Sequence, residues 1–109
     1  MRLISQDGMI DVPYEISALS IGRIGESATI YVRSKLLDEK PCVFATYYTE
    51  IKAIKAMEML REKYAKLEIF KSVYQKGLLT ELNKELGFDE MQNILTPIFQ
   101  FPKDEEVEV

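Results

Sequence analysis

The sequence predicts one α+β domain, a mostly antiparallel β-meander with one long helix packed on a face and a short C-terminal helical segment. Short apolar runs separated by turn residues fill positions 1–48, and apolar residues recur every three or four positions over 49–76. With 109 residues and 47% hydrophobic content, the chain can bury one modest core. The rest is predicted as short helices over 77–95, a last strand over 96–103 and an acidic tail over 104–109.

A hairpin opens the predicted meander. The runs 3–5 and 9–12 flank Gln6-Asp7-Gly8, and Asp-Gly between two apolar-containing runs is typical of a tight turn. We therefore expect Asp7 or Gly8 to adopt a positive φ. Pro13 has no N–H to donate to a sheet, so it should end the second strand or lie on a sheet edge.

Three more strands complete the predicted meander. The third contains Ile16, Leu19 and Ile21 and is closed by a turn over 22–25. Residues 28–35 form the fourth, because apolar and polar side chains alternate along it. One face of this strand would carry Ile30 and Val32, and the other Thr29, Tyr31 and Arg33. A polar loop over 36–41 leads to 42–47, which is apolar on both faces and is therefore predicted as the central strand.

The periodicity changes to that of an α-helix at Thr49, a suitable N-cap. Glu50 suits the positive end of the helix dipole, and Gly77 is a suitable C-terminal stop. The apolar stripe comprises Ala53, Met57, Leu60, Tyr64, Leu67, Phe70 (or Lys71) and Tyr74. A helix over 49–76 would be about 40 Å long, which is long for so small a domain, so a kink or break near residues 63–67 is an alternative.

Short elements follow Gly77. The sequence predicts a helix over 80–86 that Gly87 ends, and a further turn over 89–95. Thr96-Pro97 breaks this helical run. Residues 98–101 alternate and are closed by Pro102, which is typical of a last strand that returns to the sheet.

Charge is unevenly distributed along the chain. There are 14 Lys and Arg against 18 Asp and Glu, a net charge of −4, and residues 104–109 hold four acids and no base. The remaining body is neutral, which argues against duplex DNA as a partner. We interpret the tail as a solvated terminus, with nucleic-acid mimicry or binding to a basic partner as alternatives.

Composition excludes several chemistries. One cysteine and no histidine rule out an intrachain disulfide, the common zinc-ligand sets and a His-based triad. No apolar run approaches the roughly 20 residues of a membrane span. The N-terminus becomes polar after four residues, unlike a signal peptide. We therefore expect a soluble cytoplasmic protein with no membrane partner, no metal and no cofactor.

Two candidate catalytic sites have simpler interpretations. Asp7 and Asp11 could face each other across the first hairpin, and paired carboxylates bind magnesium or transfer protons. Aspartate is also favoured in turns by backbone hydrogen bonding, and Asp11 could simply point to solvent. Cys42 opens an apolar strand, where a free cysteine packs as a small hydrophobe, and no catalytic partner for it can be named. We therefore predict that the protein is not an enzyme.

A sheet surface is the candidate binding site. Tyr31 and Arg33 share a face of the fourth strand beside Thr29, and an aromatic ring with a guanidinium can stack a base and hold its phosphate. The predicted ligand-binding residues are Arg2, Arg23, Tyr31, Arg33 and Tyr48 (or Tyr47). Ordinary half-exposed sheet surface is the alternative, because Tyr and Thr are common strand formers.

Three stretches carry a family resemblance. They are residues 1–15, which contain the turn Gln6-Asp7-Gly8 and Tyr14, residues 45–50 with 52–61, and residues 99–103 with the acidic tail. In these stretches the chain resembles a family of small uncharacterised accessory proteins from prophages and mobile elements of gut Firmicutes, which residues 67–95 do not match. The resemblance implies a mobile-element protein in a bacterial cytoplasm.

That setting predicts a protein that binds and neutralises a host component, most simply as counter-defence. It could occlude a defence protein through the acidic tail and the variable region 67–95. It could instead sequester a nucleotide immune signal through Tyr31 and Arg33, as a homo-oligomer with ligand at subunit boundaries. An interaction module in phage replication or assembly is an alternative, and a small enzyme is a further one.

Overall fold

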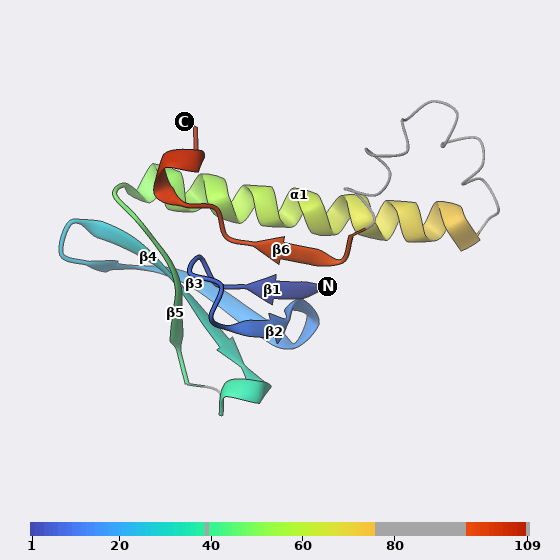
Figure 1. Ribbon diagram of the computed structural model, residues 1–109, viewed down its shortest axis with the longest axis horizontal. Helices are drawn as coiled ribbons and strands as arrows, with labels where there is room; N and C mark the ends of the chain where they lie inside the picture. Colours follow the sequence, from blue (N-terminus) through green and yellow to red (C-terminus); the bar gives the residue numbers. More distant parts are fainter. Residues whose placement is uncertain (39, 76–95, 109) are drawn as a thin grey trace. The chain divides into compact units, whose positions relative to one another are not determined.

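The computed structural model describes residues 1–38, 40–75 and 96–108 (Figure 1). The chain divides into two compact units, residues 1–60 with 98–109, and residues 61–97. The single domain predicted for residues 1–109 stays a prediction. The helices predicted over 77–95, with their stops at Gly77 and Gly87, lie outside the described residues.

The predicted α+β class is confirmed, with one long helix and two three-stranded sheets in the described residues. The first sheet has the order β2-β1-β6 and consists of β1 (Arg2–Ile4), β2 (Asp11–Pro13) and β6 (Ile98–Gln100). The second has the order β3-β4-β5 and consists of β3 (Ser17–Ile24), β4 (Ser27–Ser34) and β5 (Cys42–Tyr47). Helix α1 spans Glu50–Gln75, and short 3₁₀ turns cover Tyr14–Ile16, Lys35–Leu37 and Asp104–Glu106.

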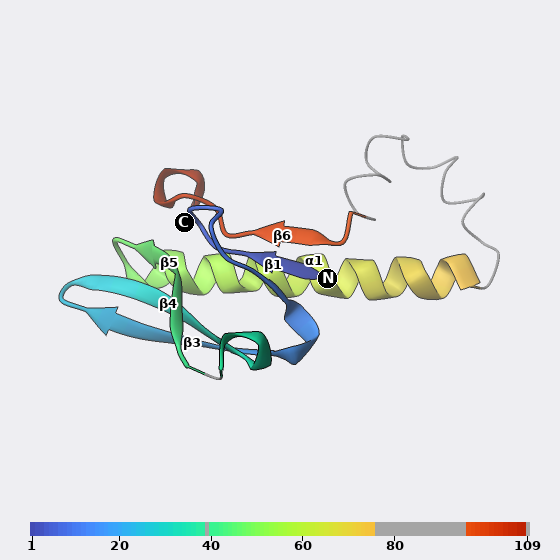
Figure 2. The ribbon, with the colours of Figure 1, turned by 60° about the horizontal axis from the view of Figure 1, so that its bottom comes forward.

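The last strand returns to a sheet as predicted, but in a different pairing from a meander. β6 runs parallel to β1, beside which it lies in Figures 1 and 2, whereas β2 pairs with β1 antiparallel. The Phe101 N–H continues the parallel ladder by donating to the Ile4 carbonyl at 3.1 Å. Parallel pairing requires a long connection between the two strands, and residues 5–97 link β1 to β6.

The opening hairpin is confirmed. The Gly8 N–H donates to the Ser5 carbonyl at 2.9 Å, and the Ser5 N–H donates to the Ile10 carbonyl at 2.9 Å. Gly8 has a φ of 77°, the left-handed conformation expected for this turn. β2 ends at Pro13 and is an edge strand, so Pro13 occupies the position predicted for it.

The predicted turn over 22–25 begins too early. β3 continues through Gly22 to Ile24, and the turn consists of Gly25 and Glu26 alone, with Gly25 at a φ of 64°. Gly22 allows the Tyr31 ring to approach the backbone closely, and it does not take part in the chain reversal. A Cβ on Gly22 would lie 2.8 Å from Cε2 of Tyr31, so the tyrosine ring occupies the space that a side chain would fill.

The prediction that residues 42–47 form the central strand is wrong, because β4 is central and β5 is an edge. A register shift between Ile30 and Tyr31 leaves β5 with one extra residue, and both Phe44 and Ala45 are buried. The apolar character on both faces therefore reflects a bulge. The neighbouring first hairpin covers the β5 edge, as described below.

Helix α1 begins as predicted. The Thr49 hydroxyl accepts from the Lys52 N–H at 3.2 Å, which makes Thr49 the N-cap. The helix is continuous from Glu50 to Gln75, so the alternative of a break near residues 63–67 does not apply. In the first unit, the helix joins both sheets and the C-terminal segment in one core. Its largest members are Leu3, Val12, Ile30, Val32, Phe44, Tyr47, Met57, Leu60, Phe101 and Val107.

The positive φ of Gly8 gives a direct test of the hairpin. Gly8→Val should lower the free energy of unfolding by about 1 to 2 kcal/mol, because a β-branched residue resists this conformation. Gly8→Asn is the matched control, because asparagine adopts a positive φ more readily, and it should cost less. Urea denaturation of both variants measures the effect, and equal midpoints for wild type and Gly8→Val would contradict the assignment.

Candidate functional site

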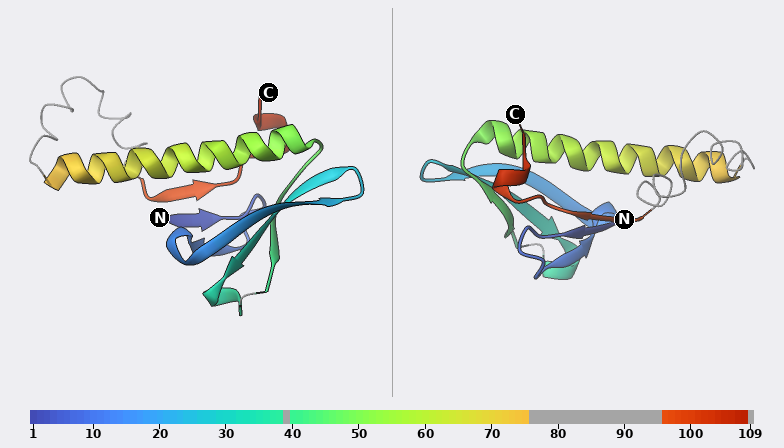
Figure 3. Two further views of the ribbon diagram at one scale, coloured as in Figure 1. Left: turned by 180° about the vertical axis from the view of Figure 1, so that it is seen from behind. Right: turned by 45° about the horizontal axis from the view of Figure 1, so that its top comes forward.

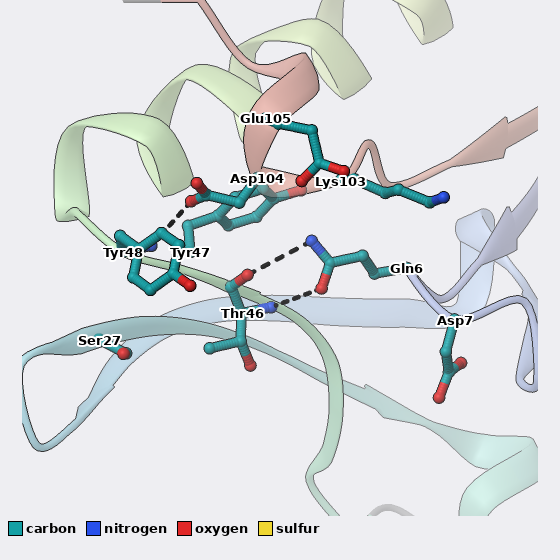
Figure 4. A pocket seen from close by; sticks show the side chains of 9 residues that line it. All are labelled: Gln6, Asp7, Ser27, Thr46, Tyr47, Tyr48, Lys103, Asp104 and Glu105. Atoms are coloured by element: carbon teal, nitrogen blue, oxygen red, sulfur yellow. Dashed lines mark hydrogen bonds between the residues drawn. The ribbon is translucent and has the colours of Figure 1, made fainter.

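An open hollow of about 420 Å³ lies where β5 leads into α1 (Figure 4). The first hairpin, the ends of β4 and β5, and the C-terminal segment all contribute to its wall. The lining residues are Gln6, Asp7, Ser27, Thr46, Tyr47, Tyr48, Lys103, Asp104 and Glu105. Of the predicted ligand-binding set this hollow contains only Tyr48 (and its alternative Tyr47), together with Gln6 and Asp7 of the resemblance-carrying turn.

Gln6 covers the edge of β5. Its side-chain amide donates to the Thr46 carbonyl at 3.3 Å and accepts from the Thr46 N–H at 3.1 Å, as the dashed lines in Figure 4 show. Its backbone N–H donates to the Phe44 carbonyl at 2.7 Å. The side chain thus reproduces the reciprocal pair of hydrogen bonds that a neighbouring strand would make. The hairpin turn therefore ties the first sheet to the second.

The Pro102 carbonyl is the second junction of the hollow. It accepts from Gln6 Nε2 at 3.0 Å and from the Tyr47 hydroxyl at 2.7 Å. Burial, helped by the carboxylates of Asp104 and Glu106, raises the pKa of Tyr47 above its usual range. Tyr47 is therefore a protonated donor at neutral pH and serves the fold through this hydrogen bond.

Asp104 joins the C-terminal segment to the start of α1. Its carboxylate accepts from the Tyr48 N–H at 2.9 Å and from Lys52 Nζ at 2.9 Å, and the same ammonium donates to the Asp104 carbonyl at 3.1 Å. The Tyr48 hydrogen bond first, and then Lys52, lower the pKa of Asp104. The position beside the helix N-terminus favours a negative charge as well.

The acidic tail is solvated only in part: Glu105, Glu106 and Glu108 are exposed as predicted, whereas Asp104 is half-buried and Val107 is buried. Residues Asp104–Glu106 form a 3₁₀ turn beside the first turns of α1 (Figure 3), and Glu106 accepts from the Lys103 N–H at 2.9 Å. Val107 is 3% exposed and belongs to the core. Burial of the Val107 side chain stabilises the packing of this segment against the core, whereas Glu105 and Glu108 are exposed.

The carboxylates of the first hairpin have separate partners. Asp7 accepts from the Ser5 hydroxyl at 2.6 Å and from the Met9 N–H at 2.9 Å, and these two bonds lower its pKa. Asp11 accepts from Arg2 Nε at 2.8 Å. Within the described residues no three His, Cys, Asp or Glu side chains lie together as metal ligands would. The geometry therefore fits the structural interpretation of Asp7 in a turn.

Tyr31 and Arg33 lie on one face of β4, as predicted, and Arg33 is exposed. Thr29 was expected beside them on this half-exposed surface, but it is 0% exposed, and its hydroxyl has no hydrogen-bond partner among the described residues. Thr29 pairs directly with Gly22, over which the Tyr31 ring lies. The Tyr31 ring therefore fills the surface beside Thr29, and the Thr29 side chain is not accessible from solvent.

The arginines predicted to assist Arg33 lie elsewhere. Arg23 pairs with the buried Ala28, so it belongs to the opposite face of the sheet, where its guanidinium contacts Glu50. Arg2 belongs to the first sheet and pairs with Asp11. The five predicted ligand-binding residues therefore do not form one site, and their binding roles stay predictions.

Two shallow hollows flank these elements. One, of about 380 Å³, is lined by Ile16, Ser17, Ala18, Arg33 and Lys35. The other, of about 230 Å³, is lined by Ile51, Ile54, Lys55, Glu58 and Glu108. The apolar stripe predicted from the sequence does not include Ile51 or Ile54. A large apolar residue that lies off such a stripe is expected to face away from the core, and this signal would have identified both residues.

The resemblance-carrying turn has mainly structural contacts. Gln6 and Asp7 make the hydrogen bonds described above, and the Tyr14 N–H donates to the Met1 carbonyl at 2.8 Å. No family model matches the chain, and comparison with curated proteins and with solved structures likewise gave no match. No helix in the described ranges is long and apolar enough to cross a membrane. The mobile-element family therefore stays a prediction.

Burial of Val107 predicts that the C-terminal segment contributes to stability. Val107→Ala should lower the free energy of unfolding by about 2 kcal/mol, from lost apolar burial and the cavity left behind. Glu108→Ala is the neighbouring control and should change it little, because Glu108 is exposed. Urea denaturation of the two variants measures both effects. Equal stability of Val107→Ala and wild type would show that the segment is not part of the core.

Asp104 predicts a pH-dependent contribution to stability. Its pKa in the fold lies below the ordinary 3.8, so the ionised carboxylate stabilises the protein above that pH, and the effect is lost as the pH falls through the lowered pKa. Asp104→Asn keeps an acceptor for the Tyr48 N–H but removes the charge. We expect the variant to be less stable than wild type at neutral pH, with the difference shrinking below about pH 4. Denaturation across a pH series measures this, and a pH-independent difference would contradict it.

Proposed function

We propose that the protein is a non-enzymatic binding protein of a phage or mobile element that neutralises a host component by occluding a defence protein in the bacterial cytoplasm. The observation that supports occlusion is an apolar patch at the start of α1. Tyr48, Ile51 and Ile54 are 78%, 60% and 43% exposed. Large apolar side chains, aromatic ones above all, form the centres of protein interfaces.

Charge around the apolar patch favours a partner with a basic rim. Ile51 and Ile54 share their hollow with Glu58 and Glu108, and Tyr48 shares the larger one with Glu105. Lys55 Nζ lies 3.8 Å from Glu58 Oε2, and its positive charge offsets part of the negative charge around the patch. A ring of polar groups around an apolar centre is the usual arrangement of a protein interface, and complementary rim charge accelerates association.

Nucleotide sequestration is the second candidate, favoured by one observation. Arg33 and Lys35 line the same hollow, and two cations side by side suit a phosphate. Tyr31 lies on the same face of β4 as Arg33 and would provide stacking. Arg2, Arg23 and Tyr48 lie away from this hollow, which removes three of the five predicted contributors, so occlusion is the form that we favour.

Phage plaquing tests occlusion. Bacteria that carry a panel of defence systems are transformed with the gene, and restored plaquing identifies the target class. Tyr48→Ala should weaken binding to that target about thirtyfold, a loss of about 2 kcal/mol, because the exposed ring would be an interface anchor. Tyr31→Ala and Arg33→Ala are the controls on the other surface and should retain activity. Unchanged melting temperatures would show that each variant remains folded.

The opposite order of effects would favour sequestration. In that case Tyr31→Ala and Arg33→Ala abolish activity and Tyr48→Ala does not. A nucleotide at 100 times its Kd would also stabilise the protein by about 2.7 kcal/mol, visible as a rise in melting temperature. If plaquing is restored against no system in a broad panel, the result would count against both occlusion and sequestration.

A further inference from the structure

The β3-β4-β5 sheet has two edges of different kinds. Gln6 covers the β5 edge with hydrogen bonds from its backbone and its side chain. β3 forms the other edge over eight residues, Ser17–Ile24, and Figure 2 shows it along the border of the sheet. Natural proteins usually blunt long edges with proline, charge or a covering loop, because an open edge pairs with further strands.

The turn that follows β3 identifies which backbone groups point outward. Ile24 pairs with Ser27 across the two-residue turn, and such turns close on a hydrogen-bonded pair. Antiparallel pairing alternates, so every second residue of β3 bonds to β4 and the others direct their N–H and C=O away from it. The outward residues are Ser17, Leu19, Ile21 and Arg23. The Ser17 N–H donates to the Tyr14 carbonyl, whereas no backbone hydrogen bond outside the ladder is found for Leu19, Ile21 or Arg23 within the described residues.

We infer that β3 pairs with β3 of a second copy of this chain, antiparallel about a two-fold axis at Ser20, to make one continuous six-stranded sheet. This register places Leu19 opposite Ile21 of the other copy and Ser17 opposite Arg23. Leu19 and Ile21 then exchange both hydrogen bonds, and the Arg23 N–H donates to the Ser17 carbonyl of the other copy, because the Ser17 N–H is already bonded to Tyr14. A two-fold axis at Leu19 or Ile21 would leave at least one of the four outward residues without a strand partner.

The side chains of β3 suit a second copy. Leu19 and Ile21 are half-buried against the core, and the added strand would cover their remaining apolar surface. On the other face, Ala18 would lie opposite Gly22, so that small residues meet. Arg23 is the one charge on the strand and would face Ser17, so no like charges lie opposite each other. The contact is isologous and closes at two copies.

Two charge variants at the axis test this register. Ser20 is exposed and would meet its own copy, so Ser20→Glu and Ser20→Lys each place like charges opposite each other. By sedimentation equilibrium, wild type should reach about 25 kDa, twice the 12.6 kDa chain, with a micromolar Kd. Each variant alone should dimerise about fivefold more weakly or worse, and an equal mixture of the two should recover the dimer.

A cysteine at the axis gives an independent measurement. In a Cys42→Ala background, Ser20→Cys should form an oxidised dimer on a non-reducing gel, because residues at the axis meet as a close, non-hydrogen-bonded pair. Ala18→Cys is the matched control and should run as a monomer on this gel, because its thiol would face Gly22 in the dimer and could form no disulfide. A 12.6 kDa wild type throughout the micromolar range would overturn the inference. A dimer unaffected by both Ser20 charges would overturn it as well, by requiring another surface.

Discussion

The first unit depends on a single carbonyl, that of Pro102. It accepts from the Gln6 amide and from the Tyr47 hydroxyl, and so joins the first hairpin, the end of β5 and the C-terminal segment at one point. Proline lacks an N–H, so this residue ends the β6 ladder while its carbonyl remains available as an acceptor. Buried donors without acceptors are costly, which explains why three distant segments converge here.

The same junction sets the start of α1. Residues that follow Pro102 turn back beside the helix, where Asp104 accepts from Tyr48 and Lys52 and Val107 enters the core. The Thr49 cap and the Asp104 carboxylate therefore both stabilise the first helical turn, one from within the local sequence and one from the end of the chain. A helix start fixed from two directions provides a rigid base for the exposed Tyr48 side chain.

Sequence reasoning succeeded where the determinant is local. The Asp7-Gly8 turn, the Thr49 cap and the α1 stripe each depend on residues within one turn of one another. The parallel β6 pairing and the Gln6 contacts join residues about 40 to 96 positions apart. Local sequence patterns carry no information about such distant contacts. The tail was predicted only in part for the same reason. Its four acids are conspicuous in the sequence, whereas its placement depends on Val107, whose core neighbours lie far away in the chain.

Candidate binding residues were the least predictable, because exposure depends on both faces of an element. Alternation correctly placed Tyr31 with Arg33, but it could not show that Thr29 would be enclosed or that Arg23 would turn to Glu50. A charge is available to a ligand only when no nearer partner holds it, and two of the predicted arginines already contact carboxylates. Among residues 1–38, 40–75 and 96–108, the surfaces that remain after these internal pairs include the Tyr48, Ile51 and Ile54 patch, the Arg33 and Lys35 hollow and the β3 edge. Each presents a different chemistry, respectively apolar side chains, cations and backbone hydrogen-bonding groups. The cationic hollow also includes Ser17 and Ala18 of β3, so a phosphate and a second strand would compete for one end of that edge, whereas a partner protein would bind at the apolar patch.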